Sequence, residues 1–191
     1  MTIKKHLTFM VILVLFFSSF TSGCKKNVIS PEIQESIDWS LPVIYNAQGS
    51  NFSNPTRLSK LLKNPKFEFI LLYFWATWNE PDNSELIYLE KLFQAYGEKG
   101  LLVVGISIDT TKDPEMIITK LRDLKSNDGS PFSILYPTLL DNENIVSKSY
   151  DISALPCRII LDKKNRIVYK SSGFSIDRML DLENKIRELL P

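Results

Sequence analysis

The chain has 191 residues, of which 44% are hydrophobic and 24% charged, a composition typical of one globular domain with a short extension. Removing Lys4 and Lys5, which lie in the leader described next, lowers the count of basic side chains from 23 to 21, against 22 acidic ones. A nearly neutral domain exerts no long-range attraction on a polyanion, so we expect no nucleic-acid partner.

Residues 1–23 predict an export signal. Lys4 and Lys5 form its positive region, residues 7–20 are an almost uninterrupted apolar run, and Thr21-Ser22-Gly23 is a small-residue cleavage site. The apolar run has about 14 residues, whereas a membrane-spanning helix needs about 20, so a retained anchor helix is the weaker alternative.

The segment Ser22-Gly23-Cys24 resembles a bacterial lipobox, in which the cysteine sulfur receives a diacylglyceryl group before the leader is removed. The resemblance implies a lipoprotein of the bacterial cell envelope, anchored to a membrane through Cys24. Thr21 departs from the usual aliphatic residue, which leaves simple cleavage, with Cys24 as a free thiol, as the alternative. Lys25-Lys26 favours the periplasmic side over the cell surface.

The segment from Cys24 to Asp38 is polar and predicts a flexible tether, followed by one domain over residues 39–191. Lipidation of Cys24 would leave Cys157 as the single thiol, so no internal disulfide could form. The only histidine, His6, lies in the leader, which excludes Cys-His and Ser-His catalysis in the exported protein.

From Trp39 onward, apolar strands alternate with amphipathic helices. Residues 41–45 and 49–52 predict a small N-terminal hairpin, and residues 67–75 predict a strand that is buried on both faces. A helix is expected over residues 79–98, because its apolar residues recur at three and four positions to form one core-facing stripe: Leu86, Leu89, Phe93 and Tyr96.

The later elements are predicted in this order: a buried strand over 101–108, a helix beginning at Asp113-Pro114, a strand over 136–140, a short helix near 143–150, an antiparallel hairpin of 158–161 with 166–170, and a helix beginning at Ser175. The last helix is expected to place five apolar side chains on one side: Ile176, Met179, Leu180, Ile186 and Leu190. This order implies an α/β fold with helices on both faces of a mixed sheet.

Two segments resemble the TlpA/ResA-like thioredoxin family. Residues 73–82, with the sequence YFWATWNEPD, resemble its active-site segment, whose pattern is W-A-T-W-C-x-P-C. Residues 150–156 and 159–162, about 75 positions later, resemble its cis-proline loop and the following strand. The resemblance covers residues 39–191 and implies a thioredoxin-like fold with a central mixed sheet, helices on both faces and an N-terminal β-hairpin.

The family pattern is degenerate in this sequence, because Asn79 and Asp82 stand where the family has its two cysteines. In the family the first cysteine, at a helix N-terminus, attacks a substrate disulfide as a thiolate, and the second resolves the mixed disulfide. An amide and a carboxylate are not nucleophiles toward sulfur, so dithiol exchange at this site is excluded and enzymatic activity is uncertain.

A structural interpretation explains these two replacements. Asparagine is a good helix N-cap and an acid in the first turn complements the helix dipole, so Asn79 and Asp82 would stabilise the start of the helix. The alternative is that Asn79, Asp82 and Glu80 bind a cation or polar ligand, but their spacing matches no metal site, so we expect neither a metal nor a cofactor.

Glu85 matches the acid that lies beneath the dithiol in the family and takes part in proton transfer. In this chain it is either a buried carboxyl group with a raised pKa or a solvated helix residue. Cys157 has two interpretations as well. It is a small buried residue that begins a strand, or a reactive thiol that forms a mixed disulfide with a partner.

The resemblance also implies a binding groove. In the family the peptide bond before the residue matching Pro156 is cis, and the backbone there pairs with extended peptide substrates. Leu155 would supply that edge, Trp78 an apolar wall, and Glu80 and Pro81 the neighbouring rim, whereas Trp75 is expected in the core.

These residues support three hypotheses about function. The leading one is a redox-inactive envelope module that binds an extended peptide, an envelope protein or a small ligand in this groove. The second is a thiol-disulfide oxidoreductase or antioxidant-type protein that acts through the single Cys157. The third is a structural subunit of an envelope complex.

Overall fold

The computed structural model describes residues 37–47, 54–79, 83–126 and 128–191. The chain divides into residues 1–30 and 31–191, and all described residues belong to the second part. The predicted leader, Cys24 and the tether up to residue 36 lie outside the described residues, so they stay predictions. Within the described ranges, no helix has the length and apolar character needed to span a membrane.

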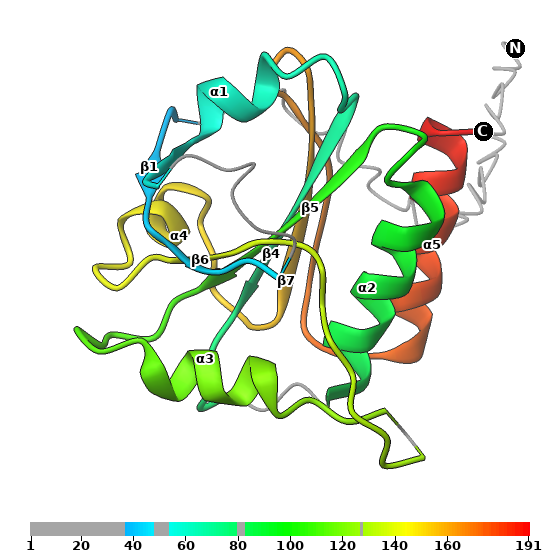
Figure 1. The fold of residues 1–191 in the computed structure, drawn as a ribbon. Coiled ribbons are helices and arrows are strands. Elements are labelled where there is room, and N and C mark those ends of the chain that lie inside the picture. The colour runs from blue at the N-terminus through cyan, green and yellow to red at the C-terminus, as the bar shows by residue number, and fades with distance from the viewer. Residues whose placement is uncertain (1–36, 48–53, 80–82, 127) are drawn as a thin grey trace, which may run out of the picture. The chain divides into compact units, whose positions relative to one another are not determined.

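The centre of the domain is a six-stranded mixed sheet with the strand order β2-β6-β5-β4-β7-β8, and β1 and β3 form a separate antiparallel pair (Figure 1). The strands are β1 Ser40–Leu41, β2 Val43–Tyr45, β3 Thr56–Arg57, β4 Phe69–Trp75, β5 Leu101–Ser107, β6 Thr138–Leu140, β7 Cys157–Asp162 and β8 Ile167–Ser172.

Strand β4 lies in the middle of the sheet, parallel to β5 and antiparallel to β7. All its residues from Ile70 to Trp75 are buried, which confirms the prediction of a strand covered on both faces. Successive side chains of a strand point to opposite faces. Leu71 and Tyr73 accordingly pack in one core, and Leu72 and Phe74 in the other.

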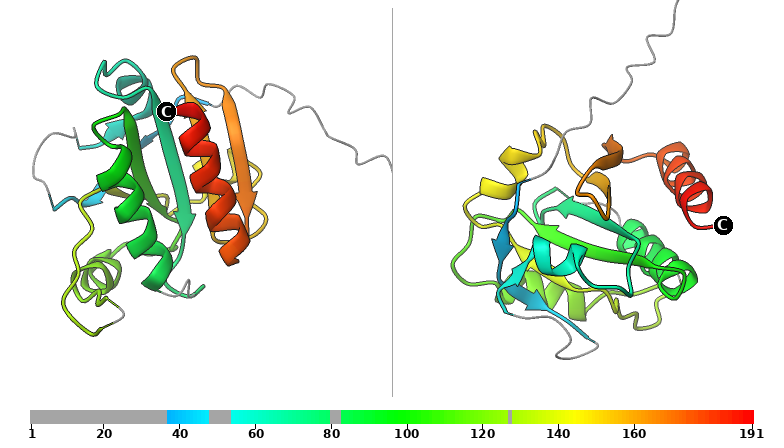
Figure 2. Two further views of the ribbon diagram at one scale, coloured as in Figure 1. Left: turned by 90° about the vertical axis from the view of Figure 1, so that its right-hand side faces the viewer. Right: turned by 90° about the horizontal axis from the view of Figure 1, so that it is seen from above.

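Helices cover both faces of the sheet, as predicted (Figure 2). One core packs against α2 Asn83–Tyr96, α3 Glu115–Arg122 and α5 Ile176–Leu189, and the other against α1 Leu58–Leu62 and α4 Ile145–Ser149. The predicted hairpin of β7 and β8 is also confirmed, with Cys157 opposite Ser172. The domain therefore has the expected thioredoxin-like α/β architecture.

Only the first strand of the predicted N-terminal hairpin falls within the described residues. Strand β2 pairs with β6, placing Val43 opposite Leu139, while β1 pairs with β3. The expected second strand, residues 49–52, lies outside the described residues, so the hairpin stays a prediction. The sequence did not predict the pairing of β2 with β6, because an apolar run does not show which strand of a sheet it joins.

Helix α5 begins where the sequence predicts, since the Ser175 hydroxyl accepts a hydrogen bond from the Arg178 N–H at 3.2 Å. Its predicted buried face is partly wrong. Ile186 is buried together with Leu182, whereas Ile176 and Leu180 are exposed. The helix is rotated so that these two residues lie beside the buried stripe.

Helix α1 was not predicted, because five residues are too few to show a helical period. The Asp38 carboxylate accepts hydrogen bonds from the Ser59 N–H at 2.9 Å and the Ser59 hydroxyl at 3.1 Å. The bond from the Ser59 N–H is the main reason why the pKa of Asp38 is lowered. Asp38, the last residue of the predicted tether, is thus bound to the domain.

Candidate functional site at the Pro156 end of the sheet

The site residues that the sequence predicts lie close to one end of the sheet in the chain. Phe74, Cys157 and Ser172 form one row across β4, β7 and β8. The chain continues from this row into the turn after β4, and it reaches the row through the loop that ends at Pro156. On the far side, the Gly173 N–H donates to the Pro156 carbonyl at 2.8 Å, which fixes the turn after β8 against that loop.

The turn after β4 is closed by a hydrogen bond from the Asn79 N–H to the Ala76 carbonyl at 3.3 Å. The described part of helix α2 starts at Asn83, so whether Asn79 caps this helix, as the sequence predicts, depends on the residues between them. The three intervening residues, Glu80, Pro81 and Asp82, lie outside the described residues. Their predicted roles stay predictions.

Asp109 holds this turn in place. Its buried carboxylate accepts hydrogen bonds from the Thr77 N–H at 3.0 Å, the Thr77 hydroxyl at 2.6 Å and the Ser107 hydroxyl at 2.7 Å. The sequence analysis missed Asp109. An acid that directly follows a buried strand was the available signal, because a buried carboxylate needs several donors.

The predicted groove residues differ in exposure. Trp78 is 67% exposed, whereas Trp75 is buried in the core as expected. Pro156 is buried, Leu155 is half-buried, and the peptide bond between them is cis. We call Trp78, Leu155 and Pro156 the Pro156 surface.

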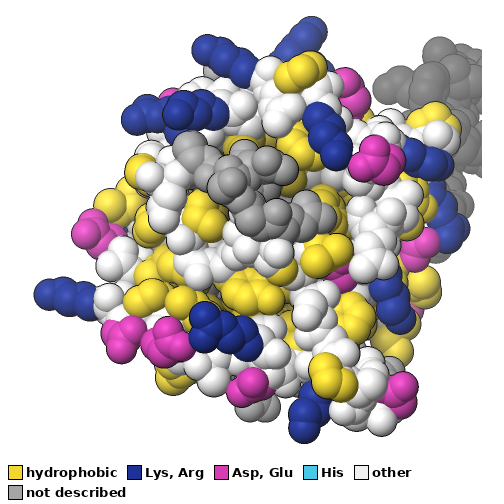
Figure 3. All heavy atoms as spheres, in the orientation of Figure 1, with side chains coloured by type: hydrophobic (Ala, Val, Ile, Leu, Met, Phe, Trp, Pro, Cys, Tyr) yellow, Lys and Arg dark blue, Asp and Glu magenta, His cyan; other side chains and the backbone are white. Residues whose placement is uncertain are grey.

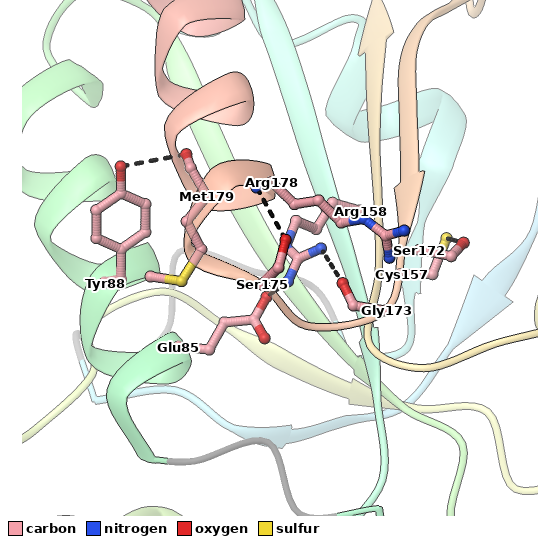
Figure 4. A network of polar contacts seen from close by, with 9 residues as sticks. All are labelled: Glu85, Tyr88, Cys157, Arg158, Ser172, Gly173, Ser175, Arg178 and Met179. Atoms are coloured by element: carbon pink, nitrogen blue, oxygen red, sulfur yellow. Dashed lines mark hydrogen bonds and ion pairs between the residues drawn. The ribbon is translucent and has the colours of Figure 1, made fainter.

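Glu85 and Arg158 form an ion pair in which both side chains are 0% exposed (Figure 4). Glu85 is in the first turn of α2, and Arg158 is the second residue of β7. Burial raises the pKa of Glu85, and the neighbouring Arg158 and Tyr73 oppose that rise. Of the two predicted environments of Glu85, the structure has the buried one.

Sequence reasoning missed Arg158 as the partner of Glu85. The signal was present, because an arginine within the apolar strand Cys157–Asp162 is rarely buried without a counterion. Its partner, however, is 73 positions away in the chain, and no spacing rule connects them.

Cys157 faces the opposite side of the sheet from Arg158 and is 0% exposed. The Ser172 hydroxyl donates a hydrogen bond to its sulfur at 3.2 Å. Burial raises the pKa of the Cys157 thiol, although this hydrogen bond acts in the other direction. A buried thiol with a raised pKa is a poor nucleophile, so the geometry corresponds to the small buried residue at the start of a strand.

Among the described residues, neither a metal centre nor the cavity given below coincides with the Pro156 surface. Within the part of the chain that the structure describes, no cluster of three or more His, Cys, Asp or Glu residues could hold a metal ion. A cavity of about 630 Å³ lies between α1 and the end of α2, where Leu61, Phe67, Phe93 and Pro137 contribute to its lining. None of the Pro156 surface residues lines this cavity.

Comparisons with known proteins agree with this architecture. The chain is 25% identical over 191 residues to the thiol-disulfide oxidoreductase ResA of Bacillus cereus, covering 98% of this chain and 99% of ResA.

Two solved structures are similar in fold. A thiol-disulfide oxidoreductase from Bacteroides fragilis has a TM-score of 0.59 and 23% identity, over 82% of this chain and 100% of that one. The exposed lipoprotein thioredoxin of Streptococcus pneumoniae has a TM-score of 0.59 and 18% identity, over 80% and 99% of the two chains. Residues 33–170 match the AhpC/TSA family, and the chain therefore belongs to the AhpC/TSA family, with ResA-like relatives.

Proposed function

We propose that this protein is a cell-envelope binding module that is redox-inactive at the family's dithiol site and holds an extended peptide segment at the Pro156 surface. The observation that carries the proposal is chemical. Asn79 takes the place of the nucleophilic cysteine, and Cys157, the one cysteine among the described residues, is buried. The scaffold of an oxidoreductase is thus retained without an accessible thiol on it.

The exposed indole of Trp78 supports a binding role. Aromatic side chains are enriched at the centres of protein interfaces, because they bury a large area at a low cost in conformational entropy. Trp75, three residues earlier, is buried in the core. The exposure of Trp78 is therefore specific to its position in the turn.

The backbone beside Pro156 supports an extended peptide as the occupant. Neither the N–H nor the C=O of Leu155 makes a backbone hydrogen bond with any residue that the structure describes. Backbone groups without a partner can pair with an extended peptide, with the main chain supplying hydrogen bonds and neighbouring side chains supplying selectivity. The half-buried Leu155 and exposed Trp78 would then contact apolar side chains of the peptide.

The surface charge does not favour a polyanion. On the face shown in Figure 3, basic side chains are more frequent at the upper end, and basic, acidic and apolar side chains are mixed over the rest. This agrees with a formal net charge of only +1. Recognition would depend on shape and hydrogen bonding more than on electrostatic steering.

The proposed location is the outer face of a membrane, with an acyl anchor on Cys24 and the domain facing the periplasm. The leader sequence and the lipobox resemblance support it, and one protein of similar fold is an exposed lipoprotein. Intact mass after membrane extraction tests this part: an acylated chain that begins at Cys24 is expected, and an unmodified mature chain would contradict it.

The binding role is tested with the full-length chain in detergent and a peptide selected against it from a random display library. Trp78→Ala is expected to weaken binding by about tenfold or more, which corresponds to about 1.4 kcal/mol. Ile145→Ala is the matched control, because Ile145 is also an exposed large apolar residue, at the start of α4. Equal affinities of all three proteins would contradict binding at the Pro156 surface.

The names of the relatives favour a second candidate, a thiol-disulfide oxidoreductase that acts through Cys157. Such activity requires the sulfur to reach a substrate disulfide and to ionise, and both are opposed by its burial. The Cys157→Ser variant separates the two candidates, because turnover that depends on this thiol would be lost in it.

A further inference from the structure

The guanidinium group of Arg158 connects three segments of the candidate site (Figure 4). One of its terminal nitrogens donates to the Glu85 carboxylate in the first turn of α2. The other donates to the carbonyl of Gly173, in the turn between β8 and α5, at 3.1 Å. Arg158 itself lies two positions after Pro156, so its backbone belongs to the third segment.

The backbone completes this arrangement. The same Gly173 whose carbonyl accepts from Arg158 donates its N–H to the Pro156 carbonyl. Pro156 and the turn after β8 are therefore held together both directly and through the Arg158 side chain. On the opposite face of the sheet, the Ser172 hydroxyl donates to the Cys157 sulfur, so residues 156–158 are fixed from both sides.

Stability alone does not account for a buried ion pair at this place. Removing two charges from water is costly, and an apolar pair of similar volume is often as stable or more stable. The pair gives directional contacts between separate segments, which an apolar pair would not give. Defined geometry is the property that a recognition surface needs from its supporting residues.

We propose that Arg158 is a positioning residue for peptide binding: its contacts with Glu85 and Gly173 hold Pro156 and the start of α2 at the separation that the Pro156 surface requires. This inference rests on the proposed function. It assigns Glu85 the role of a fixed counterion, different from the proton-transferring acid that the family resemblance implies.

The test compares Glu85→Leu, Arg158→Met and the double variant Glu85→Leu/Arg158→Met. Each single variant leaves one charge buried without its partner and is expected to lose stability, whereas the double variant should regain most of it. If Arg158 positions the surface, the double variant will not regain binding. Its affinity for the display-selected peptide is expected to stay about tenfold below that of the wild type, and exchange of the Gly173 amide hydrogen should be about tenfold faster.

Arg166→Met is the matched control, because Arg166 is also paired with an acid, Asp162, but at the other end of the same hairpin. It should leave both readouts unchanged. A double variant with wild-type stability, wild-type affinity and wild-type Gly173 exchange would show that the pair is merely structural and overturn the proposal.

Two further results remain decisive. If the double variant does not fold, Arg158→Lys replaces it, since lysine keeps the charge but lacks the two-pronged geometry; Gly173 exchange at the wild-type rate would then count against the positioning role. If the wild type binds no selected peptide, the proposed function fails, while the Gly173 exchange rates still decide whether Arg158 holds the segments together.

Discussion

The Ser172 hydroxyl donates a hydrogen bond to the sulfur of the buried Cys157 across the β7–β8 pair, at 3.2 Å. Cys157 is therefore satisfied as a structural residue, and its pKa is raised by burial. This relationship determines how the thiol should behave in solution.

We expect Cys157 to resist alkylation in the folded protein. At about pH 8, near the ordinary pKa of a thiol, its reaction with iodoacetamide should be more than about tenfold slower than in denaturant, because the sulfur must first be exposed by opening of the structure. Mass spectrometry of timed samples measures both rates. Equal rates would show an accessible, reactive thiol.

The same burial gives a pH dependence with a definite sign. The folded-state pKa of Cys157 lies above the unfolded value, so its contribution to stability is complete below the unfolded pKa and is lost as pH rises through the folded pKa. The free energy of unfolding should therefore decline on the alkaline side of about pH 9 by less in Cys157→Ser than in the wild type. Denaturant melts at several pH values provide the test, and parallel declines in the two proteins would contradict it.

The bond between Thr77 and Asp109 should stabilise the turn that presents Trp78. Thr77→Val removes the hydroxyl that donates to the buried carboxylate at 2.6 Å, and we expect a loss of about 1–3 kcal/mol in the free energy of unfolding. Thr110→Val, at an exposed position nearby, is the control and should change stability by less than about 0.5 kcal/mol. Similar losses in the two variants would argue against this role for Asp109.

Much of the fold followed from the sequence, and the residues show why. Strand β4 was identifiable because it is continuously apolar, and the start of α5 because Ser175 is a good N-cap. Helix α1 was not, since it is short and its first turn is capped by Asp38, a residue 21 positions before Ser59.

The candidate site was less predictable. The sequence located Trp78, Pro156 and Glu85, but it did not predict the turn in which the Asn79 N–H bonds to the Ala76 carbonyl. The pairing of Glu85 with Arg158 depends on the three-dimensional register of α2 against β7. The arginine in an apolar strand signals a counterion, but which acid supplies it is decided by tertiary packing.

The loop between α3 and β6 offers an independent check on side-chain geometry. Hydrogen bonds from Ser126 and Ser130 lower the pKa of Asp128 to about 2. A lowered folded-state pKa means that the contribution of Asp128 to stability is present above its unfolded value and is lost as pH falls through the folded pKa. A carboxyl NMR titration should give a midpoint of about 2, moving toward the ordinary value in Ser126→Ala; an ordinary midpoint in the wild type would contradict the hydrogen-bond geometry.

The capping role of Ser175 can be tested at the other side of the site. Ser175→Ala removes the acceptor for the Arg178 N–H and should cost about 1 kcal/mol in the free energy of unfolding. Ser153→Ala, at an exposed loop position, is the control and should have almost no effect. Equal stability of all three proteins would contradict the capping role of Ser175.

The central claim, that a thioredoxin-like scaffold operates here without thiol chemistry, is tested most directly by insulin reduction with dithiothreitol. Wild type and Cys157→Ser are compared with a dithiol-containing thioredoxin as the positive control. Both proteins are predicted to match the rate of dithiothreitol alone, because Asn79 and Asp82 cannot exchange electrons and the sulfur of Cys157 is buried. Turnover by the wild type that is lost in Cys157→Ser would contradict the account.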